Sequence, residues 1–131
     1  MDRLLELNIN DIELKGMLEQ CPSVIDMDSS YIDNMLNILR YVGCNDKHIK
    51  NIIISNPYYL ERLDRDVLKL IKYLKEIGLS SLGLIFDMNP FLLNKDDFEI
   101  KEYVNKRIND GKLLDDIIDE IESNPYVFEE V

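Results

Sequence analysis

SNPYYL, residues 55–60, places an Asn-Pro pair before apolar side chains, and the same pattern returns twice later in the chain. MNPFLL covers residues 88–93 and SNPYVF covers residues 123–128. Every proline belongs to this series, and the residues that define it are Pro22, Asn56, Pro57, Asn89, Pro90, Asn124 and Pro125. Successive prolines are separated by 35, 33 and 35 residues. A regular period of this length is typical of solenoids built from helical hairpins.

Three glycines repeat with the same period. Gly43, Gly78 and Gly111 each follow a proline by 21 residues. The distance from a proline to the glycine before it is 14, 12 or 14 residues. We therefore expect one half of each unit to have a constant length and the other half to accept a deletion.

The half of constant length has the pattern of an amphipathic helix. Its apolar positions in the second unit are Val67, Leu70, Ile71, Leu74 and Ile77. A shift of 35 residues toward the N-terminus gives a second apolar set, which is Ile32, Met35, Leu36, Leu39 and Val42. This spacing predicts one helix with a buried face in each unit.

The ends of these longer helices carry capping signals. Ser29 or Ser30 is the predicted N-cap of the first helix, and Asp64 is the predicted N-cap of the second. Gly43 and Gly78 suit the C′ position, where glycine ends a helix in a left-handed conformation.

The third copy of the longer helix departs from the pattern. Arg107 and Asp110 fall where leucine and isoleucine are expected, whereas Ile100, Tyr103 and Val104 match. We therefore expect this helix to be rotated or frayed in its last turn.

In the half of variable length, the sequence pattern predicts a shorter helix before each proline. These helices are expected within residues 10–20, 45–55, 80–88 and 113–123, and Asn45 or Asp46 is the expected cap of the second. Gly83 lowers the helix propensity of the third of these segments, which is therefore the weakest helix prediction. The residue before a proline avoids the α region, so Asn-Pro ends the shorter helix, and Asn at the N-cap with Pro at N1 then begins a short helical turn. Cys21 replaces the asparagine in the first unit.

The predicted fold class is all-α, a short α-solenoid of about three and a half helix–proline turn–helix repeats with about seven helices. We expect a single domain over residues 1–131, with repeats at approximately 8–42, 43–77 and 78–110 and a partial repeat at 111–131. The pattern is compatible with either handedness. The partial repeat either caps the array or leaves an apolar face for a partner.

This pattern resembles the mitochondrial transcription termination factor (mTERF) family. Repeats of that family have a Gly-Leu-Ser opening, a short helix, an Asn-Pro-x-Leu-Leu turn and a longer helix ending in Leu-Gly. EIGLSSLGLIFDMNPFLL at residues 76–93 matches best, and YVGCNDKHIKNIIISNPYYL at residues 41–60 comes next. The resemblance covers about residues 7–128. It implies a curved helical solenoid that binds nucleic acid and regulates organellar transcription or RNA processing.

Charge is distributed unevenly along the chain. The net charge of −11 is the balance of −6 in residues 1–39, +3 in residues 40–78 and −8 in residues 79–131. A strongly negative protein repels phosphate backbones, which argues against a nucleic-acid partner except at the basic middle unit.

Four basic residues of the middle unit follow helical spacing and form one stripe: Arg65, Lys69, Lys72 and Lys75. The functional interpretation is a nucleic-acid-binding face that contacts phosphates. The simpler interpretation, which we favour, is the solvated outer face of an amphipathic helix.

Two further patterns have alternative interpretations. Tyr58, Phe91 and Tyr126 directly follow the repeated prolines, where they either stack on bases or, as we favour, anchor the turn with a partly exposed ring. The acidic run at residues 115–122 either mimics a row of phosphates, binds a basic partner or, as we favour, forms the polar face of the last helix. The buried residues of that helix would be Ile117, Ile118 and Ile121.

No enzyme is predicted. The sequence has no Gly-rich phosphate loop, nucleophile elbow or metal-ligand spacing, so no catalytic residue, metal or cofactor is expected. The single histidine, His48, lacks a recognisable catalytic constellation, and Cys21 and Cys44 are interpreted as reduced, half-buried thiols. The acidic N-terminus and the interrupted apolar window at residues 77–93 predict neither a targeting segment nor a membrane span, so the cytoplasm is the expected location.

The leading functional hypothesis is a non-catalytic helical-repeat binding module that engages a protein partner. The alternative is an mTERF-like, nucleic-acid-binding regulator of transcription that uses the basic stripe of the middle repeat.

Overall fold

The computed structural model describes residues 2–130 and confirms the all-α solenoid. The α-helices are α1 (Asp2–Leu5), α2 (Asp11–Gln20), α3 (Ser29–Tyr41), α4 (Asp46–Ser55), α5 (Asp64–Glu76), α6 (Leu82–Met88), α7 (Asp97–Asn109) and α8 (Leu114–Ser123). A 3-10 turn begins at each proline, and these turns are η1 (Pro22–Asp26), η2 (Pro57–Glu61), η3 (Pro90–Asn94) and η4 (Pro125–Glu130). Within the described residues, α1 is the one helix that the repeat pattern does not predict.

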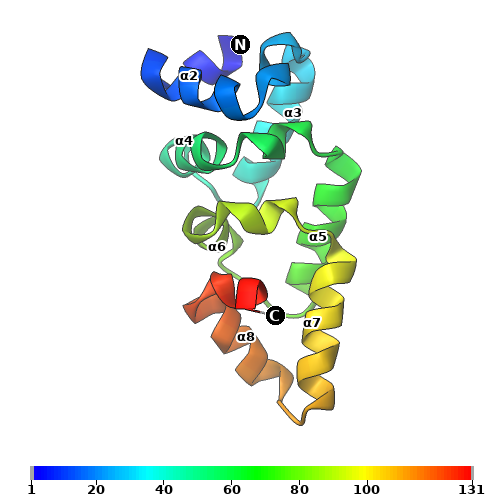
Figure 1. Cartoon of the computed structure of the whole chain (residues 1–131). Helices are drawn as coiled ribbons and strands as arrows, with labels where there is room; N and C mark the ends of the chain where they lie inside the picture. Colours follow the sequence, from blue (N-terminus) through cyan, green and yellow to red (C-terminus); the bar gives the residue numbers. More distant parts are fainter. Residues whose placement is uncertain (1, 131) are drawn as a thin grey trace.

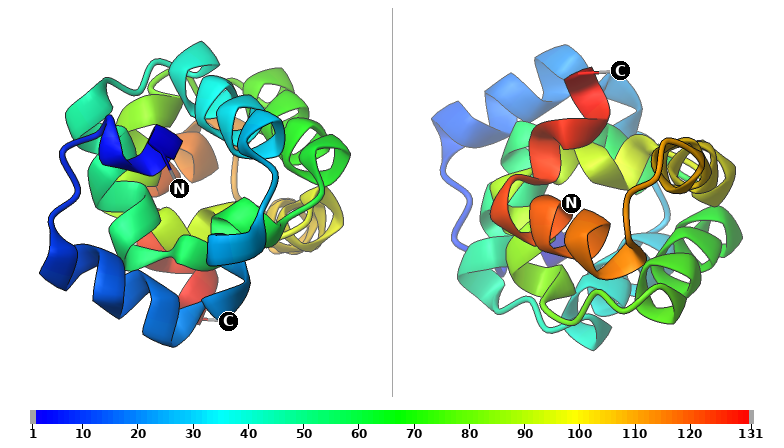
Figure 2. Two further views of the ribbon diagram at one scale, coloured as in Figure 1. Left: turned by 90° about the horizontal axis from the view of Figure 1, so that it is seen from above. Right: turned by 90° about the horizontal axis from the view of Figure 1, so that it is seen from below.

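Equivalent elements of successive units stack on one another. The shorter helices α2, α4 and α6 contact in order, and so do the longer helices α3, α5 and α7 and the turns η1, η2 and η3. Figure 1 shows the shorter helices in one column and the longer helices in another, with the proline turns crossing between them. The view along the stack in Figure 2 shows the units superimposed on one another. The chain is therefore organised as a quasi-one-dimensional array.

The core runs continuously between the two columns. The apolar stripe of α5 is buried, with Val67, Leu70 and Leu74 fully hidden from solvent. The matching stripe of α3 is buried in the same way. Burial of one such side chain contributes roughly 1.5–3 kcal/mol, so the repeated stripe is a substantial source of stabilisation.

Glycine ends each longer helix as predicted. Gly43, Gly78 and Gly111 have φ values of 103°, 111° and 97°. The amide of Gly43 donates to the Arg40 carbonyl at 3.0 Å, and the amide of Cys44 donates to the Leu39 carbonyl at 3.0 Å. These two bonds define a Schellman motif, in which glycine tolerates the left-handed conformation without strain.

The predicted N-caps of the longer helices are wrong by one or two positions. Asp28 caps α3, where its carboxylate accepts from the amide of Ser30 at 2.8 Å. Leu63 occupies the N-cap of α5, so Asp64 is the first residue of the helix. The Asp64 carboxylate instead accepts a hydrogen bond from Asn34 at 3.0 Å. A bond to the preceding unit therefore replaces the expected cap. Asn45 does cap α4, with its side chain accepting from the amide of His48 at 2.8 Å.

The third longer helix does not fray. α7 continues through Asn109, and its last turn ends in the same glycine motif as the other two. Arg107 remains helical and forms an ion pair with Glu120 at 2.8 Å. Charged residues are tolerated here because this turn of α7 lines an open groove, across which Arg107 pairs with Glu120 of α8.

Gly83 has a packing role that the sequence did not predict. A Cβ atom at this position would lie 2.9 Å from the carbonyl carbon of Gly43 and 3.1 Å from the amide nitrogen of Cys44. The glycine that weakens α6 by propensity therefore allows α6 to approach the end of α3 closely.

Asn56 and Asn89 occupy the N-cap positions of η2 and η3, but their side chains do not cap these turns. The Asn124 side chain does cap η4, accepting from the amide of Tyr126 at 3.2 Å. Asn56 and Asn89 are completely buried, and their side-chain amides donate to the carbonyls of Pro90 at 3.0 Å and Pro125 at 3.1 Å. Each asparagine therefore joins its own unit to the next. We call these bonds the asparagine ladder, formed by Asn56 and Asn89.

The first unit lacks the ladder asparagine, and a different hydrogen bond joins it to the second unit. Cys21 lies 3.7 Å from the hydroxyl of Ser23, and Ser23 donates a hydrogen bond to Glu61 in the next unit. Contrary to the expectation of half-buried thiols, Cys21 and Cys44 are 1% and 6% exposed. Both are free thiols.

Candidate binding surfaces

All four residues of the predicted stripe are exposed on the outer face of α5. They do not act as four equivalent charges. The Lys75 ammonium lies 4.0 Å from the centroid of the Tyr41 ring, which is a cation–π contact between α5 and α3. Lys72 lies 4.0 Å from Glu76 one turn later. Lys69 and Arg65 make no ion pair within the described residues.

A pocket of about 350 Å³ lies beside the C-terminal half of the stripe. We call it the α3/α5 pocket, and it is lined by Tyr41, Leu68, Ile71, Lys72, Lys75 and Glu76. The structure thus brings two of the four stripe residues to the pocket, and Arg65 and Lys69 lie outside its lining. Tyr41 and Leu68 are 69% and 44% exposed. Exposed apolar residues between lysines suit recognition of another macromolecule.

Sequence reasoning missed Tyr41 and Leu68. Leu68 lies outside the apolar stripe of α5, and Tyr41 precedes the C-cap of α3, so neither fits a core position. The signal available in the sequence was that each is an apolar or aromatic residue outside the predicted buried stripe, which indicates an exposed position.

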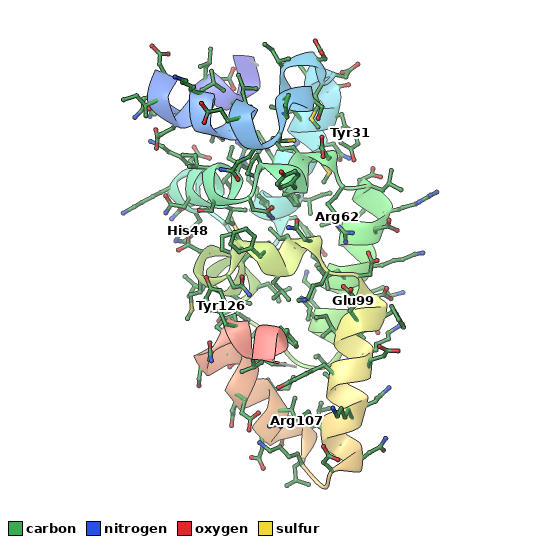
Figure 3. The ribbon with its side chains drawn as sticks, in the orientation of Figure 1. Tyr31, His48, Arg62, Glu99, Arg107 and Tyr126 are labelled. Atoms are coloured by element: carbon green, nitrogen blue, oxygen red, sulfur yellow. The ribbon has the colours of Figure 1, made fainter. Side chains whose placement is uncertain are left out.

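A larger groove of about 710 Å³ lies between α7, α8 and η4. We call it the α7/α8 groove, and six of its lining residues are Tyr103, Lys106, Arg107, Asp119, Glu120 and Asn124. Figure 3 shows Arg107 on the side of α7 that faces α8. Glu120 accepts hydrogen bonds from Arg107 and Lys112, and these cations hold the pKa of its carboxyl below the ordinary range, with Lys112 the larger cause.

Arg62 joins the middle units through its guanidinium. One nitrogen lies 2.9 Å from the Asp96 carboxylate, and another donates to the Lys95 carbonyl at 2.9 Å. Tyr31 of the first unit donates to the carbonyl of Arg62. Figure 3 shows Arg62 above Glu99, where the second unit meets the start of α7. These contacts join successive units and occupy the Arg62 guanidinium, so Arg62 is not a candidate binding residue.

The remaining candidate residues anchor turns, cap a helix or form an exposed helix face. Tyr58, Phe91 and Tyr126 are each a little under half exposed, as expected for rings that anchor the turns. His48 belongs to the capping box of α4. The acidic run forms the exposed face of α8, and Ile117, Ile118 and Ile121 are buried as predicted.

Among residues 2–130, no group of three His, Cys, Asp or Glu side chains is arranged to hold a metal ion. No helix in this part of the chain has the length and apolar character needed to cross a membrane.

The stacked hairpins, the proline turns and the buried asparagines define the class of protein as a helical-repeat solenoid. A model of the mTERF family matches residues 2–111, and the chain belongs to this family. No curated protein and no solved structure matched the chain.

Proposed function

We propose that this mTERF-family chain is a non-catalytic binding module that engages a protein through the α3/α5 pocket. Residues 1–131 act as one domain with the repeat boundaries given above, and the cytoplasm is the proposed location. The observation that carries the proposal is that Lys72 and Lys75 flank a pocket containing the exposed side chains of Tyr41 and Leu68.

The chemistry of the α3/α5 pocket favours a partner segment that is both apolar and acidic. Tyrosine supplies a large contact area at low entropic cost and is enriched among residues that dominate interface energies. Lys72 and Lys75 pair with carboxylates at the rim, where such pairs improve specificity and association rate more than affinity. An amphipathic helix with leucine on one side and glutamate beside it meets both requirements.

The test is a fluorescence anisotropy titration with a designed helical peptide that carries leucine on one face and glutamate on the flanks. We expect saturable binding that is weakened by Tyr41→Ala/Leu68→Ala and by Lys72→Glu/Lys75→Glu. Arg65→Glu is the matched control, since Arg65 lies on the same stripe but outside the pocket. Binding that is unaffected by both double variants would overturn the proposal.

The second candidate function is nucleic-acid binding. Membership of the mTERF family and the exposure of all four residues of the α5 stripe favour it. Titrations with duplex DNA, single-stranded DNA and RNA at low and moderate salt test it against a Lys69→Glu/Lys72→Glu/Lys75→Glu variant. Salt-sensitive binding that this variant abolishes would assign phosphate contacts to the stripe.

A further inference from the structure

The α7/α8 groove occupies the place where a longer helix packs in the inner units. α5 packs on α3, and α7 packs on α5 in the same relation. In each case the incoming helix places a lysine over a tyrosine of the helix beneath it. Lys75 lies 4.0 Å from the Tyr41 ring, and Lys101 lies 5.2 Å from the Tyr73 ring. In the described residues, nothing packs on α7 in this way.

At several positions that line this place, the last unit has charged residues where the inner units have apolar or aromatic ones. A shift of 33 residues aligns Tyr73 with Lys106 and Leu74 with Arg107. On the other wall, a shift of 35 residues aligns Ile85 with Glu120. Leu74 and Ile85 are buried, whereas their charged counterparts meet across the groove as an ion pair. The groove therefore carries charged residues at positions that belong to the buried core in the inner units, beside the apolar side chains of Tyr103 and Val127.

Acidic charge in and around the groove is only partly neutralised. α8 carries five acidic residues and no basic one. Within residues 2–130, Glu120 is the member of this set that forms ion pairs. Asp110 and Asp119 line the groove, are exposed and form no ion pair in the same part of the chain. An occupant that carries positive charge would neutralise them.

The groove also contains an unused hydrogen-bond donor. Asn124 has the position of Asn56 and Asn89 in its unit, but it is exposed and its side-chain nitrogen makes no hydrogen bond within the described residues. The equivalent nitrogens of Asn56 and Asn89 each donate to a backbone carbonyl. A polypeptide that covers this end of the array can therefore accept a hydrogen bond from the side-chain nitrogen of Asn124.

We propose that the α7/α8 groove binds a cationic amphipathic helix of a partner protein, which packs on α7 as α7 packs on α5. The helix places lysine or arginine beside Asp110 and Asp119, and its apolar side chains cover Tyr103 and Val127. This surface is separate from the α3/α5 pocket and does not depend on the function proposed for it. A second copy of the chain is a poor occupant because residues 1–39 and 79–131 are both strongly acidic.

The test uses a labelled peptide with the sequence of residues 62–79, because this cationic segment contains the helix that packs on α3. We expect saturable anisotropy binding to the full chain. Asp110→Lys/Asp119→Lys should raise the dissociation constant about tenfold or more. Asp115→Lys/Glu122→Lys changes the charge equally on residues outside the groove lining and should have little effect. All four positions lie outside the core, so each variant should keep its circular dichroism spectrum.

Three results would overturn the proposal. One is absence of saturable binding at the highest soluble peptide concentration. Another is an equal loss of affinity in the groove variant and its control, which would indicate a general charge effect. The third is sedimentation of the free chain as a dimer that the groove variant dissociates, because the occupant would then be a second copy. The Lys72→Glu/Lys75→Glu variant should bind the peptide normally, which separates this test from that of the α3/α5 pocket.

Discussion

The side-chain nitrogen of Asn56 lies 3.0 Å from the carbonyl oxygen of Pro90, and this bond joins residues of adjacent units that are 34 positions apart in the sequence. Asn94 completes the arrangement, since its side chain exchanges two hydrogen bonds with Asn56 at 2.9 and 3.0 Å. Buried amide groups are costly unless they are paired, so the Asn-Pro pair fixes the register between units as well as ending a helix.

Removal of the ladder should destabilise the fold. Asn56→Ala removes the side chain that donates to the buried Pro90 carbonyl and that pairs with the exposed Asn94, and we expect a loss of about 1–3 kcal/mol in the free energy of unfolding. Asn124→Ala is the matched control, because this asparagine is exposed and loses only its bond from the Tyr126 amide, so we expect a smaller loss of about 0.5 kcal/mol. Urea denaturation measures both, and equal effects would contradict the ladder.

Gly83→Ala should destabilise the chain although alanine is the better helix former. The new methyl group would lie 2.9 Å from the Gly43 backbone, and such overpacking costs about 1–3 kcal/mol. Gly16→Ala is the control in α2, since a Cβ there meets nothing within 4 Å. We expect it to stabilise the protein by up to about 1 kcal/mol. Thermal and urea unfolding of the pair should therefore shift in opposite directions.

Two adjacent tyrosines should respond differently to loss of the hydroxyl. Tyr59 is buried and its hydroxyl donates to the Met35 carbonyl at 2.6 Å, so Tyr59→Phe should cost about 1 kcal/mol. Burial also raises the pKa of Tyr59. Tyr58 is 46% exposed, and Tyr58→Phe should change stability by less than about 0.5 kcal/mol. Similar effects of the two substitutions in urea denaturation would refute the assigned role of the Tyr59 hydroxyl.

Stability should fall at high pH partly because of Cys44. Burial, with a smaller effect of Asp87, raises the pKa of this thiol from 9.0 to about 11. The folded state favours the neutral thiol, so this contribution is complete below pH 9 and is lost as the pH rises through about 11. The free energy of unfolding of the wild type should therefore decrease more steeply over this range than that of Cys44→Ala. Parallel pH profiles would show that the thiol does not contribute.

The repeated features of the fold could be predicted because the same sequence pattern occurs in several units. The period of the prolines and glycines predicted the hairpins, and the apolar stripe predicted the buried face of α5. The partner of Asn56 was not predictable, because it lies one unit away and local capping gave a sufficient reason for an asparagine before proline.

The candidate surfaces were less accessible to sequence reasoning. The stripe on α5 was predicted to be exposed, but its relation to Tyr41 depends on how α5 packs on α3. The irregular positions Arg107 and Asp110 were interpreted as a defect of α7. Their charge is explained by the groove that they face, which becomes apparent only when α7 and α8 are placed together.

The most direct test of the proposed function compares the acidic amphipathic peptide with single-stranded RNA and duplex DNA on the same variants at two salt concentrations. A protein-binding pocket predicts that Tyr41→Ala/Leu68→Ala weakens peptide binding and that part of the wild-type affinity persists at the higher salt, because apolar contact is not screened. Tighter binding of nucleic acid than of peptide, with strong salt dependence and no effect of the Tyr41 and Leu68 substitutions, would contradict the proposal and favour phosphate recognition by the α5 stripe.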